Sequence, residues 1–485
     1  MSYILLMLFP AVMGASCFIL RKQTRLVIIA AVLTMVVQIG VLFPLPTNEP
    51  ARMLGLTLSL DPLSRLFLIA FLCVAAFAFM ASWRLPHGEN FVPVTMLILS
   101  FAATTLLLLQ EPFMVALLLI SAGLLAVLAI VDLPTGSPLL VGRATIATAL
   151  KYMVLMVIAG VMMYLAFVLL DVAQPGQTLD RVSPARLTLG LVAVGFGLRL
   201  ATVPFHSWLP DVAEDAAPMV SVIVITVLNV TSLLFLTNTF QFHPDLVFGN
   251  ERGFAILRGF GIATALLGAI LALAQTNMRR MLGYLIVYDA GMIVFGIASL
   301  SPTGLAGALF QAFNQIIIVM LLFLSIALLE RPDGRPSNVQ RRDLLRRWPV
   351  AGTGLLAGGL ALLGLPPFNG FASKLLLYEA AVQQGGVTLV LLLISTGLAL
   401  LALVRVARDR LLGPSDDQPV AESPLLVGAT DLDRPAERRL EPEPRGLALL
   451  VSVLLALCLG IGLYPQPLLA TINEVIRGLT FVRSF

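Results

Sequence analysis

The chain has 485 residues, of which 59% are hydrophobic and only 12% are charged, and its mean hydropathy is +0.97. This composition excludes a soluble domain and predicts an all-α polytopic membrane protein with one integral-membrane domain. The net charge of +4 fits arginines stationed at one membrane face, so we assign no nucleic-acid role.

Apolar runs bounded by Pro, Gly and charged residues predict about fourteen transmembrane helices. The first run, residues 2–20, is followed rather than preceded by basic residues, which predicts a retained span and not a cleavable signal peptide. The runs begin near residues 2, 25, 62, 91, 112, 144, 187, 218, 254, 281, 305, 347, 386 and 446.

Lysine and arginine gather in the loops that follow the odd-numbered spans, and the other loops carry little beyond Arg52, Arg181, Arg186 and Arg252. The positive-inside rule therefore places the odd loops in the cytoplasm and both termini outside it. We expect the chain to cross a bacterial inner (plasma) membrane. The last odd loop, residues 411–445, is rich in Pro, Asp, Glu and Arg, which predicts a mobile cytoplasmic loop and, less readily, a docking segment.

The stretch 199–218, RLATVPFHSWLPDVAEDAAP, places Arg199 and His206 within the seventh predicted span. Pro204 and Pro210 each remove a backbone donor and clash with the preceding turn, so we expect both to open the helix. A charge inside a broken transmembrane helix is costly and usually functional, which points to an ion path.

A second interruption follows five spans later, at GLPPFNG in residues 364–370 with Pro366 and Pro367, and Lys374 comes shortly after it. Two broken helices in corresponding places are typical of inverted repeats with the ion path at their interface. We therefore predict an N-terminal unit of spans 1–3, a first repeat of spans 4–8, a second repeat of spans 9–13, a mobile loop and span 14. These five parts cover residues 1–90, 91–240, 254–406, 411–445 and 446–466.

The two interrupted segments resemble those of a known family. The motifs VPFHSWLPD at residues 203–211 and GLPPFNGF at residues 364–371, the latter followed by Ser373 and Lys374, are similar to those of the antiporter-like membrane subunits of respiratory complex I, membrane-bound hydrogenases and multisubunit sodium/proton antiporters. The resemblance implies a proton-translocating subunit of a complex I-like NADH:quinone oxidoreductase or a related energy-converting complex. It implies other membrane subunits and the lipid bilayer as partners, and protons as the transported ion, with sodium as the alternative.

Family members are understood to move protons along buried Glu and Lys residues, and Lys374 is the one plainly retained here. Residues 113–131 of the fifth span hold no acid where the family has a glutamate, and Arg199 replaces the lysine of the seventh span. Other family positions are also changed, namely those at Asn229, Thr231, Asp289, Gln311, Gln315 and Val319. Because arginine stays charged and amides hold no extra proton, we expect reduced conduction through the N-terminal half.

Lys374 is more readily a functional ionisable group than a structural one, and its candidate counter-ions are Asp289 and Glu379. If Asp289 faces Lys374, opposite charges favour a static ion pair, which weakens the relay interpretation. For Arg199 two roles are nearly balanced. One is a fixed cation that tunes a neighbouring site, and the other, slightly favoured, is a structural group that binds carbonyls freed by Pro204.

The other candidates each have two interpretations. His206 suits a cytoplasmic proton entrance or an interfacial histidine without a transport role. Lys151 fits a snorkelling anchor better than a link toward the seventh span. Gln311, Asn314 and Gln315 recur on one helical face, where they hydrate a channel or hydrogen-bond neighbouring helices.

The acidic residues after the first interruption, Asp211, Glu214 and Asp215, are solvated loop charge or, less readily, a mouth that gathers cations. We recognise no nucleotide loop, metal cluster, haem site or catalytic triad, so we expect no cofactor and no metal, and any redox centre in partner subunits. Two alternatives accompany the leading hypothesis: a non-pumping scaffold subunit of the same assembly, and a subunit of a multisubunit sodium/proton antiporter. A stand-alone transporter is disfavoured by the two motifs.

Overall fold

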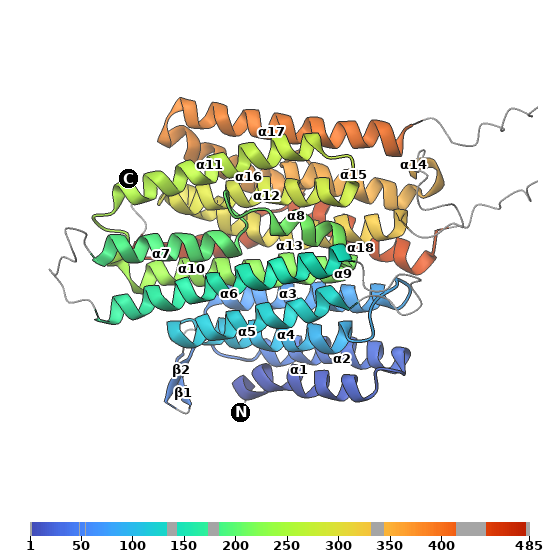
Figure 1. The fold of residues 1–485 in the computed structure, drawn as a ribbon, viewed down its shortest axis with the longest axis horizontal. Helices are drawn as coiled ribbons and strands as arrows, with labels where there is room; N and C mark the ends of the chain where they lie inside the picture. Colours follow the sequence, from blue (N-terminus) through green and yellow to red (C-terminus); the bar gives the residue numbers. More distant parts are fainter. Residues whose placement is uncertain are drawn as a thin grey trace, which may run out of the picture.

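The computed structural model describes residues 2–47, 49–53, 55–132, 143–172, 184–330, 344–413 and 443–481. Within them nearly every element is an α-helix, and the helices lie side by side along one common direction (Figure 1). Eleven helices in the described part are long and apolar enough to cross a membrane. The predicted all-α polytopic membrane class is therefore confirmed, whereas the count of fourteen spans and the repeat boundaries stay predictions.

The N-terminal part holds six helices and one hairpin. The helices are α1 (Ser2–Ile19), α2 (Thr24–Leu42), α3 (Pro62–Ser82), α4 (Phe91–Leu107), α5 (Pro112–Val131) and α6 (Arg143–Val172). A short antiparallel hairpin of β1 (Ala51–Met53) and β2 (Leu56–Leu58) joins α2 to α3. The predicted starts of these helices agree with the observed ones to within a residue or two.

The central part contains the first interruption and the most buried helices. Its helices are α7 (Pro184–Arg199), α8 (Trp208–Asp215), α9 (Pro218–Ile223), α10 (Asn229–Phe242), α11 (Glu251–Ala274), α12 (Met278–Ala298) and α13 (Pro302–Leu329). A π-helical turn, Val224–Leu228, joins α9 to α10, so the two cross as one segment.

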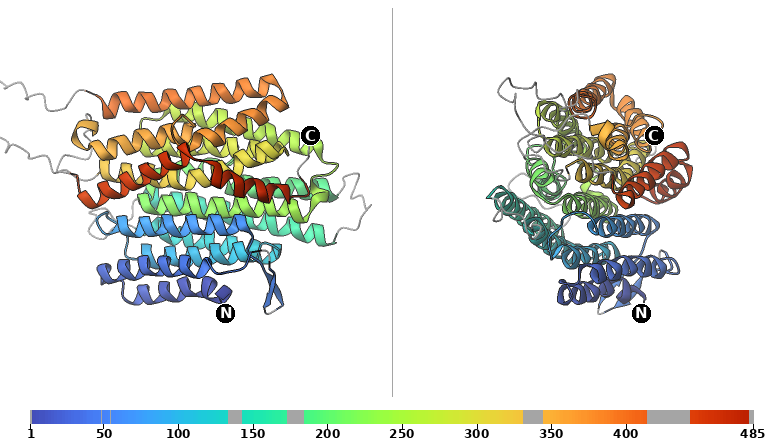
Figure 2. Two further views of the ribbon diagram at one scale, coloured as in Figure 1. Left: turned by 180° about the vertical axis from the view of Figure 1, so that it is seen from behind. Right: turned by 90° about the vertical axis from the view of Figure 1, so that its right-hand side faces the viewer.

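The C-terminal part contains the second interruption. Its helices are α14 (Leu344–Arg347), α15 (Pro349–Leu363), α16 (Gly370–Gln384), α17 (Gly386–Val406), α18 (Arg445–Leu463) and α19 (Gln466–Arg477). The predicted mobile loop at 411–445 lies mostly outside the described residues. Helix α19 was not predicted from the sequence, and it meets α18 at a bend in the middle of the bundle (Figure 2).

Local chemistry explains where several helices begin. Asp61 caps α3 by accepting a hydrogen bond from the Ser64 backbone at 3.3 Å, and Ser301 caps α13 through the Gly304 backbone at 3.1 Å. Proline occupies the first turn of both helices, where its missing N–H has no helical partner to lose. Such caps fix the register in which each apolar face meets its neighbours.

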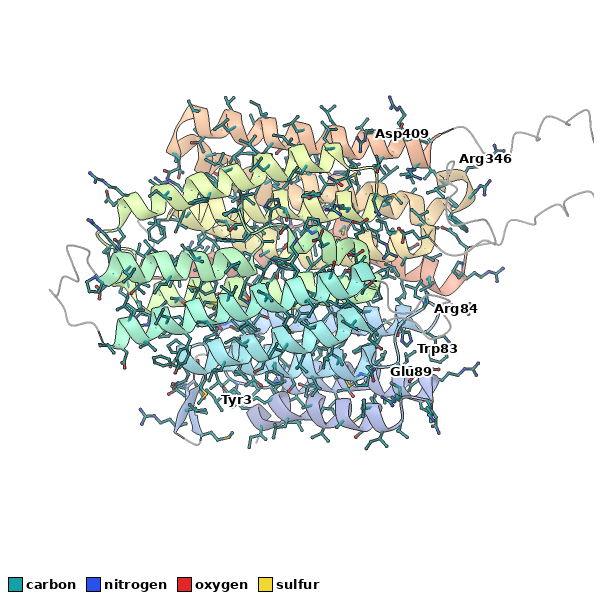
Figure 3. All side chains as sticks on the ribbon, in the orientation of Figure 1. Tyr3, Trp83, Arg84, Glu89, Arg346 and Asp409 are labelled. Atoms are coloured by element: carbon teal, nitrogen blue, oxygen red, sulfur yellow. The ribbon has the colours of Figure 1, made fainter. Side chains whose placement is uncertain are left out.

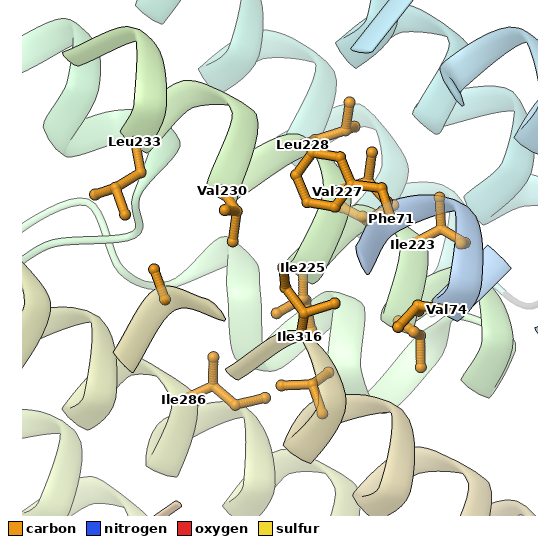
Figure 4. Packing of buried hydrophobic residues seen from close by; sticks show 14 of the residues in the cluster. Phe71, Val74, Ile223, Ile225, Val227, Leu228, Val230, Leu233, Ile286 and Ile316 are labelled. Carbon is orange, nitrogen blue, oxygen red and sulfur yellow. The ribbon is translucent and has the colours of Figure 1, made fainter. Parts of the chain in front are cut away.

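Helix α13 lies at the centre of the bundle. All of residues 304–329 are buried, and α13 contacts α3, α9, α12, α15, α16, α18 and α19. Ile316 of α13, Ile286 of α12 and Ile225 of the π-helical turn belong to one cluster of buried apolar side chains (Figure 4). A helix surrounded on all sides shields any polar side chain it carries from lipid, which makes α13 a suitable wall for an ion site.

The outer helices and the bundle ends show how the protein meets its surroundings. Large apolar side chains are exposed along α5, α6, α11 and α17, as expected where the solvent is hydrocarbon. Figure 3 places Arg84, Glu89, Arg346 and Asp409 at one end of the bundle, which is the end of the predicted cytoplasmic loops. Charge therefore gathers at an end of the molecule, and the orientation of that end stays a prediction.

Candidate ion site at the interrupted helices

The second interruption separates α15 from α16. α15 ends at Leu363, Gly364 takes a left-handed conformation with a φ of 79°, and α16 starts at Gly370. A side chain at Gly364 would be strained by this φ, and its Cβ would lie 2.7 Å from the Cβ of Lys374. Glycine therefore allows the helix to break while Lys374 packs directly against the turn.

Lys374 forms a buried ion pair with Asp289 of α12. Its Nζ donates to Asp289 Oδ1 over 2.5 Å, and the two side chains are 1% and 0% exposed. The ammonium also lies 4.6 Å from the ring centroid of Tyr288, a cation–π distance. Asp289 therefore faces Lys374, a possibility that the sequence left open. Removing two charges from water is costly, and so is breaking a buried ion pair once it has formed.

A chain of hydrogen bonds runs from this pair toward the interruption. Gln311 Nε2 donates to Asp289 Oδ1 over 2.7 Å, and Ser373 Oγ donates to Gln311 Oε1 over 2.5 Å. Asn314 Nδ2 in turn donates to Ser373 Oγ over 3.2 Å and to the Asn369 carbonyl over 2.9 Å. The members come from α12, α13, α16 and the α15–α16 turn, so the network crosses the centre of the bundle.

Two acceptors in this network have no hydrogen-bond partner in the described part of the structure, namely Asp289 Oδ2 and Asn369 Oδ1. Both side chains are fully buried. Native proteins rarely leave buried polar atoms unsatisfied, so these two atoms are where a water molecule or a proton would attach. Asn369 and Ser373 are site residues that were not predicted from the sequence, although Asn369 lies in the GLPPFNG motif and Ser373 lies directly before Lys374.

A cluster of hydroxyl groups holds the aromatic ring beside Lys374. Tyr288 and Tyr378 each share a hydrogen bond with Thr396 Oγ1 of α17, at 2.8 and 2.6 Å. Glu379, the other predicted counter-ion, is exposed and does not pair with Lys374. The physical reason is that five residues rotate a helical position by about 140°, which turns Glu379 to the outside of α16.

The bend between α18 and α19 lies against the second interruption. A Cβ on Gly462 would lie 2.5 Å from the backbone carbon of Phe368 and 2.8 Å from the backbone nitrogen of Asn369. Such spacing leaves no room for a side chain, so α18 approaches the interruption backbone to backbone. A third discontinuous segment therefore supports the turn from which Asn369 and Lys374 extend.

The first interruption lies between α7 and α8. α7 ends at Arg199, Pro204 follows in the turn, and α8 begins at Trp208. Ala201 has a φ of 55°, a left-handed conformation that costs a residue with a Cβ roughly 1–2 kcal/mol. Pro210 does not open the helix, contrary to the prediction, because it lies in the first turn of α8 where no helical hydrogen bond is lost.

The two interruptions share one backbone pattern. In both, the residue after the left-handed one donates its N–H to the carbonyl five positions earlier, over 3.0 Å, and a cis peptide bond precedes a proline of the turn. The matching positions are Gly197 and Leu360, Ala201 and Gly364, Thr202 and Leu365, Pro204 and Pro367, and Asp211 and Lys374. An acid thus stands in the first interruption where the second has its lysine.

Arg199 is buried in the first half without a carboxylate partner among the described residues. Its Nε donates to Ser232 Oγ over 2.7 Å, and its Nη1 donates to the Leu119 carbonyl of α5 over 3.3 Å. The carbonyls freed by Pro204, which the structural interpretation of Arg199 expects it to bind, are not among these acceptors. Arg199 instead connects α7 to α5 and α10, and α5 contains no acidic residue.

Ion pairs surround the start of α8. Lys151 Nζ donates to Asp211 Oδ2 over 2.7 Å, so its ammonium binds a carboxylate, and its role as a snorkelling anchor stays a prediction. Arg280 of α12 binds Glu214 at 2.9 Å and lies 3.4 Å from Asp211. Asp215 accepts a 2.6 Å hydrogen bond from a threonine of α6. Each of the three acidic residues therefore has a partner, and this cluster joins α8 to α6 and α12.

Two predicted residues lie near the ion pairs without joining the network. His206 lies in the first interruption, with its ring centroid 6.2 Å from that of Tyr284, and its Nδ1 has no partner in the described residues. Gln315 lines a cavity of about 20 Å³ together with Asn229. This cavity, between α13 and α10, has room for about one water molecule. Gln315 therefore faces the first half of the bundle, whereas Gln311 faces Asp289.

The chemistry available differs between the two interruptions. The second holds a titratable lysine and a titratable aspartate that share a dry, hydrogen-bonded centre, and such groups hold and release protons. The first holds a buried arginine, which keeps its charge, and a partly exposed ion pair. Within the described residues no group of three or more His, Cys, Asp or Glu side chains is arranged to hold a metal ion.

Known relatives match the part of the chain that contains both interruptions. The family described as "NADH:quinone oxidoreductase/Mrp antiporter, TM" matches residues 114–399. The NADH-quinone oxidoreductase subunit N of Desulfovibrio desulfuricans is 31% identical over 301 residues, which cover 60% of this chain and 56% of that protein. The chain thus spans little more than half the length of this curated relative.

Solved structures share the fold over nearly the full length. A chain of the Mrp complex from Dietzia sp. DQ12-45-1b gives a TM-score of 0.83 at 19% identity, covering 99% of this chain and 97% of its own. A chain of respiratory complex I from Thermus thermophilus gives 0.71 at 23% identity, covering 97% and 99%. At these identities the structures establish a common fold alone. The family match covers more than half of the residues, and the chain therefore belongs to the NADH:quinone oxidoreductase/Mrp antiporter transmembrane family.

Proposed function

We propose that the chain is an antiporter-like, proton-translocating membrane subunit of a redox-driven, energy-converting complex in a bacterial plasma membrane. The observation that carries this proposal is the buried Lys374–Asp289 pair at an interrupted helix, joined to a polar network in the bundle centre. The name of the curated relative and the titles of the similar structures supply the class of assembly. Partner subunits would hold every redox centre.

The geometry suggests how the pair handles a proton. A proton that reaches Asp289 Oδ2, the bare oxygen, neutralises the carboxylate and removes its attraction for Lys374. Lys374 then keeps the face of the Tyr288 ring as its neighbour and is free to release a proton of its own. Gln311 and Ser373 position the carboxylate and stay neutral throughout.

The test uses the assembled complex in sealed vesicles, with proton movement measured per electron transferred. Replacing Lys374 alone leaves a buried carboxylate uncompensated, so the informative variant is the double one, Lys374→Met with Asp289→Leu. We expect this variant to assemble and to move fewer protons per electron than the wild type. The double variant Lys151→Met with Asp211→Leu, at the matching position of the first interruption, serves as the control and should keep the wild-type ratio.

The second candidate function is a scaffold subunit that no longer pumps. It is favoured by the opposite charges of Lys374 and Asp289, which compensate each other, and by Arg199 having no acidic partner among the described residues. An unchanged proton ratio in the assembled Lys374→Met, Asp289→Leu variant would establish the scaffold role and reject the pump. A subunit of a sodium/proton antiporter is separated from both by purification in mild detergent, since it would hold no redox subunits.

A further inference from the structure

A large apolar cavity lies between α7 and α11, away from the ion site. Its volume is about 1080 Å³, at or above the roughly 300–1,000 Å³ typical of small-molecule sites. The cavity follows α7 from Arg186 to Leu200 and ends at Pro204 in the first interruption. α7 has 16 residues and is about 24 Å long, whereas one leaflet of hydrocarbon is about 15 Å thick. The cavity is therefore long enough for an acyl chain.

The wall of this cavity is apolar and reachable from the bilayer. Leu189, Val192 and Phe196 form its inner side and are buried. Ile256 and Phe260 of α11 line the cavity as well, yet they are 60% and 44% exposed. In a membrane, large apolar side chains that are exposed face hydrocarbon, so a lipid chain has lateral access to this slot.

The mouth of the cavity is cationic. Arg186 and Arg252 lie in the first turns of α7 and α11, whose starting ends lie at the same end of the bundle (Figure 1). Both side chains are exposed, and neither forms an ion pair with a residue that the structure describes. The first turn of a helix favours an anion over a cation, and among the residues that line the cavity Glu251 is the single acid beside these two arginines. Glu251 already takes part in an interaction of its own, which leaves the charge at the mouth net positive.

We propose that this cavity binds one anionic phospholipid, with its phosphate between Arg186 and Arg252 and its acyl chains along α7 as far as Pro204. A phospholipid matches the polarity of the site, because both are charged at the membrane surface and apolar below it. A seated lipid would also shield the first interruption from the surface water at that end. The proposal does not depend on proton movement through Lys374.

The experiment measures lipid retained by the full chain in its native assembly. The assembly is exchanged from mild detergent into mixed phosphatidylglycerol and phosphatidylcholine, and bound lipids are counted by native mass spectrometry. We expect one phosphatidylglycerol per chain. Arg186→Gln and Arg252→Gln should each lower the preference for phosphatidylglycerol about fivefold, since a basic residue near the headgroup contributes about that factor. Gly190→Leu, which adds a side chain where nothing lies within 4 Å, should displace both lipids.

Matched controls separate the cavity from the general surface. Gly259→Leu adds the same side chain on α11 into open space outside the cavity, and Arg52→Gln removes an exposed arginine of the hairpin, so both should retain wild-type lipid. If Gly190→Leu fails to assemble, the two exposed arginine variants decide. Wild-type protein without selective phosphatidylglycerol retention, or arginine variants with an unchanged preference, would overturn the proposal. A cross-link from Phe260 to a partner polypeptide would overturn it in favour of a docked helix.

Discussion

The interruption between α7 and α8 and the one between α15 and α16 bend the chain in the same way, but the charges beside them meet different surroundings. Lys151 and Asp211 at the first are 37% and 19% exposed, whereas Lys374 and Asp289 at the second are 1% and 0% exposed. An exposed pair contributes roughly 0–1 kcal/mol, and breaking a buried pair costs about 3–5 kcal/mol. A broken helix therefore provides space for an ion site. That space becomes an ion site when its charged pair is buried and hydrogen-bonded, as at the second interruption.

The largest expected effect on the free energy of unfolding comes from removing the acid of the buried pair, and removing the acid of the exposed pair serves as its comparison. Asp289→Ala leaves the ammonium of Lys374 buried and unpaired, and we expect a loss of about 3–5 kcal/mol in the free energy of unfolding. Asp211→Ala at the matching position should cost under about 1 kcal/mol, because water reaches its two cationic neighbours. Unfolding by titration with SDS in mixed micelles measures both, and equal losses would refute the contrast in burial.

The next effect concerns the left-handed residue of each turn. Gly364→Ala should lower the free energy of unfolding by about 2–4 kcal/mol, because a Cβ there meets an unfavourable φ and the side chain of Lys374. Ala201→Gly should do the reverse and stabilise by about 0.5–1 kcal/mol, since the relief of strain exceeds the added freedom of the unfolded chain. The same SDS titration measures the change in the free energy of unfolding for each variant. Changes of opposite sign would confirm that the two turns share a conformation, and a loss of stability in both variants would contradict it.

Much of this arrangement follows from local sequence. The apolar runs and the caps at Asp61 and Ser301 set the helices, and the proline motifs located both interruptions and pointed to Lys374. The rule that proline opens a helix misled at Pro210, because the rule holds inside a helix and α8 starts only two residues earlier. The boundary of a short helix after a break is not encoded by proline spacing alone.

The partners of the charged residues could not be predicted in this way. Lys374 meets an acid from α12 and a hydroxyl cluster that involves α17, and each helix presents several faces to choose from. Glu379 was a plausible counter-ion on composition, yet helical rotation turns it outward. Pairing between helices depends on how segments distant in sequence pack together. A single sequence shows which residues share a face of a helix, but it does not show which other helix lies against that face.

A further contrast lies in what supports each turn. The second interruption is braced by α18, where Gly462 touches the backbone of Phe368 and Asn369. Gly462→Val should push these backbones apart and cost about 1–3 kcal/mol of unfolding free energy, with a lower proton ratio in the assembled complex. Gly460→Val, two residues earlier in the same helix, adds its side chain to open space and serves as the control. If the two variants had the same unfolding free energy and the same proton ratio, α18 would not support the site.

The smallest expected effect belongs to Arg199. Arg199→Met removes two hydrogen bonds, to Ser232 and to the Leu119 carbonyl, and also removes the cost of a buried charge, so the stability should change by less than about 2 kcal/mol. Because an arginine does not release its proton, the protons moved per electron in vesicles should equal the wild-type ratio. A fall in that ratio comparable to the fall caused by the Lys374→Met, Asp289→Leu variant would mean that the first half conducts after all. The fixed cation would then have to act by shaping the field of a water path through the cavity between Asn229 and Gln315.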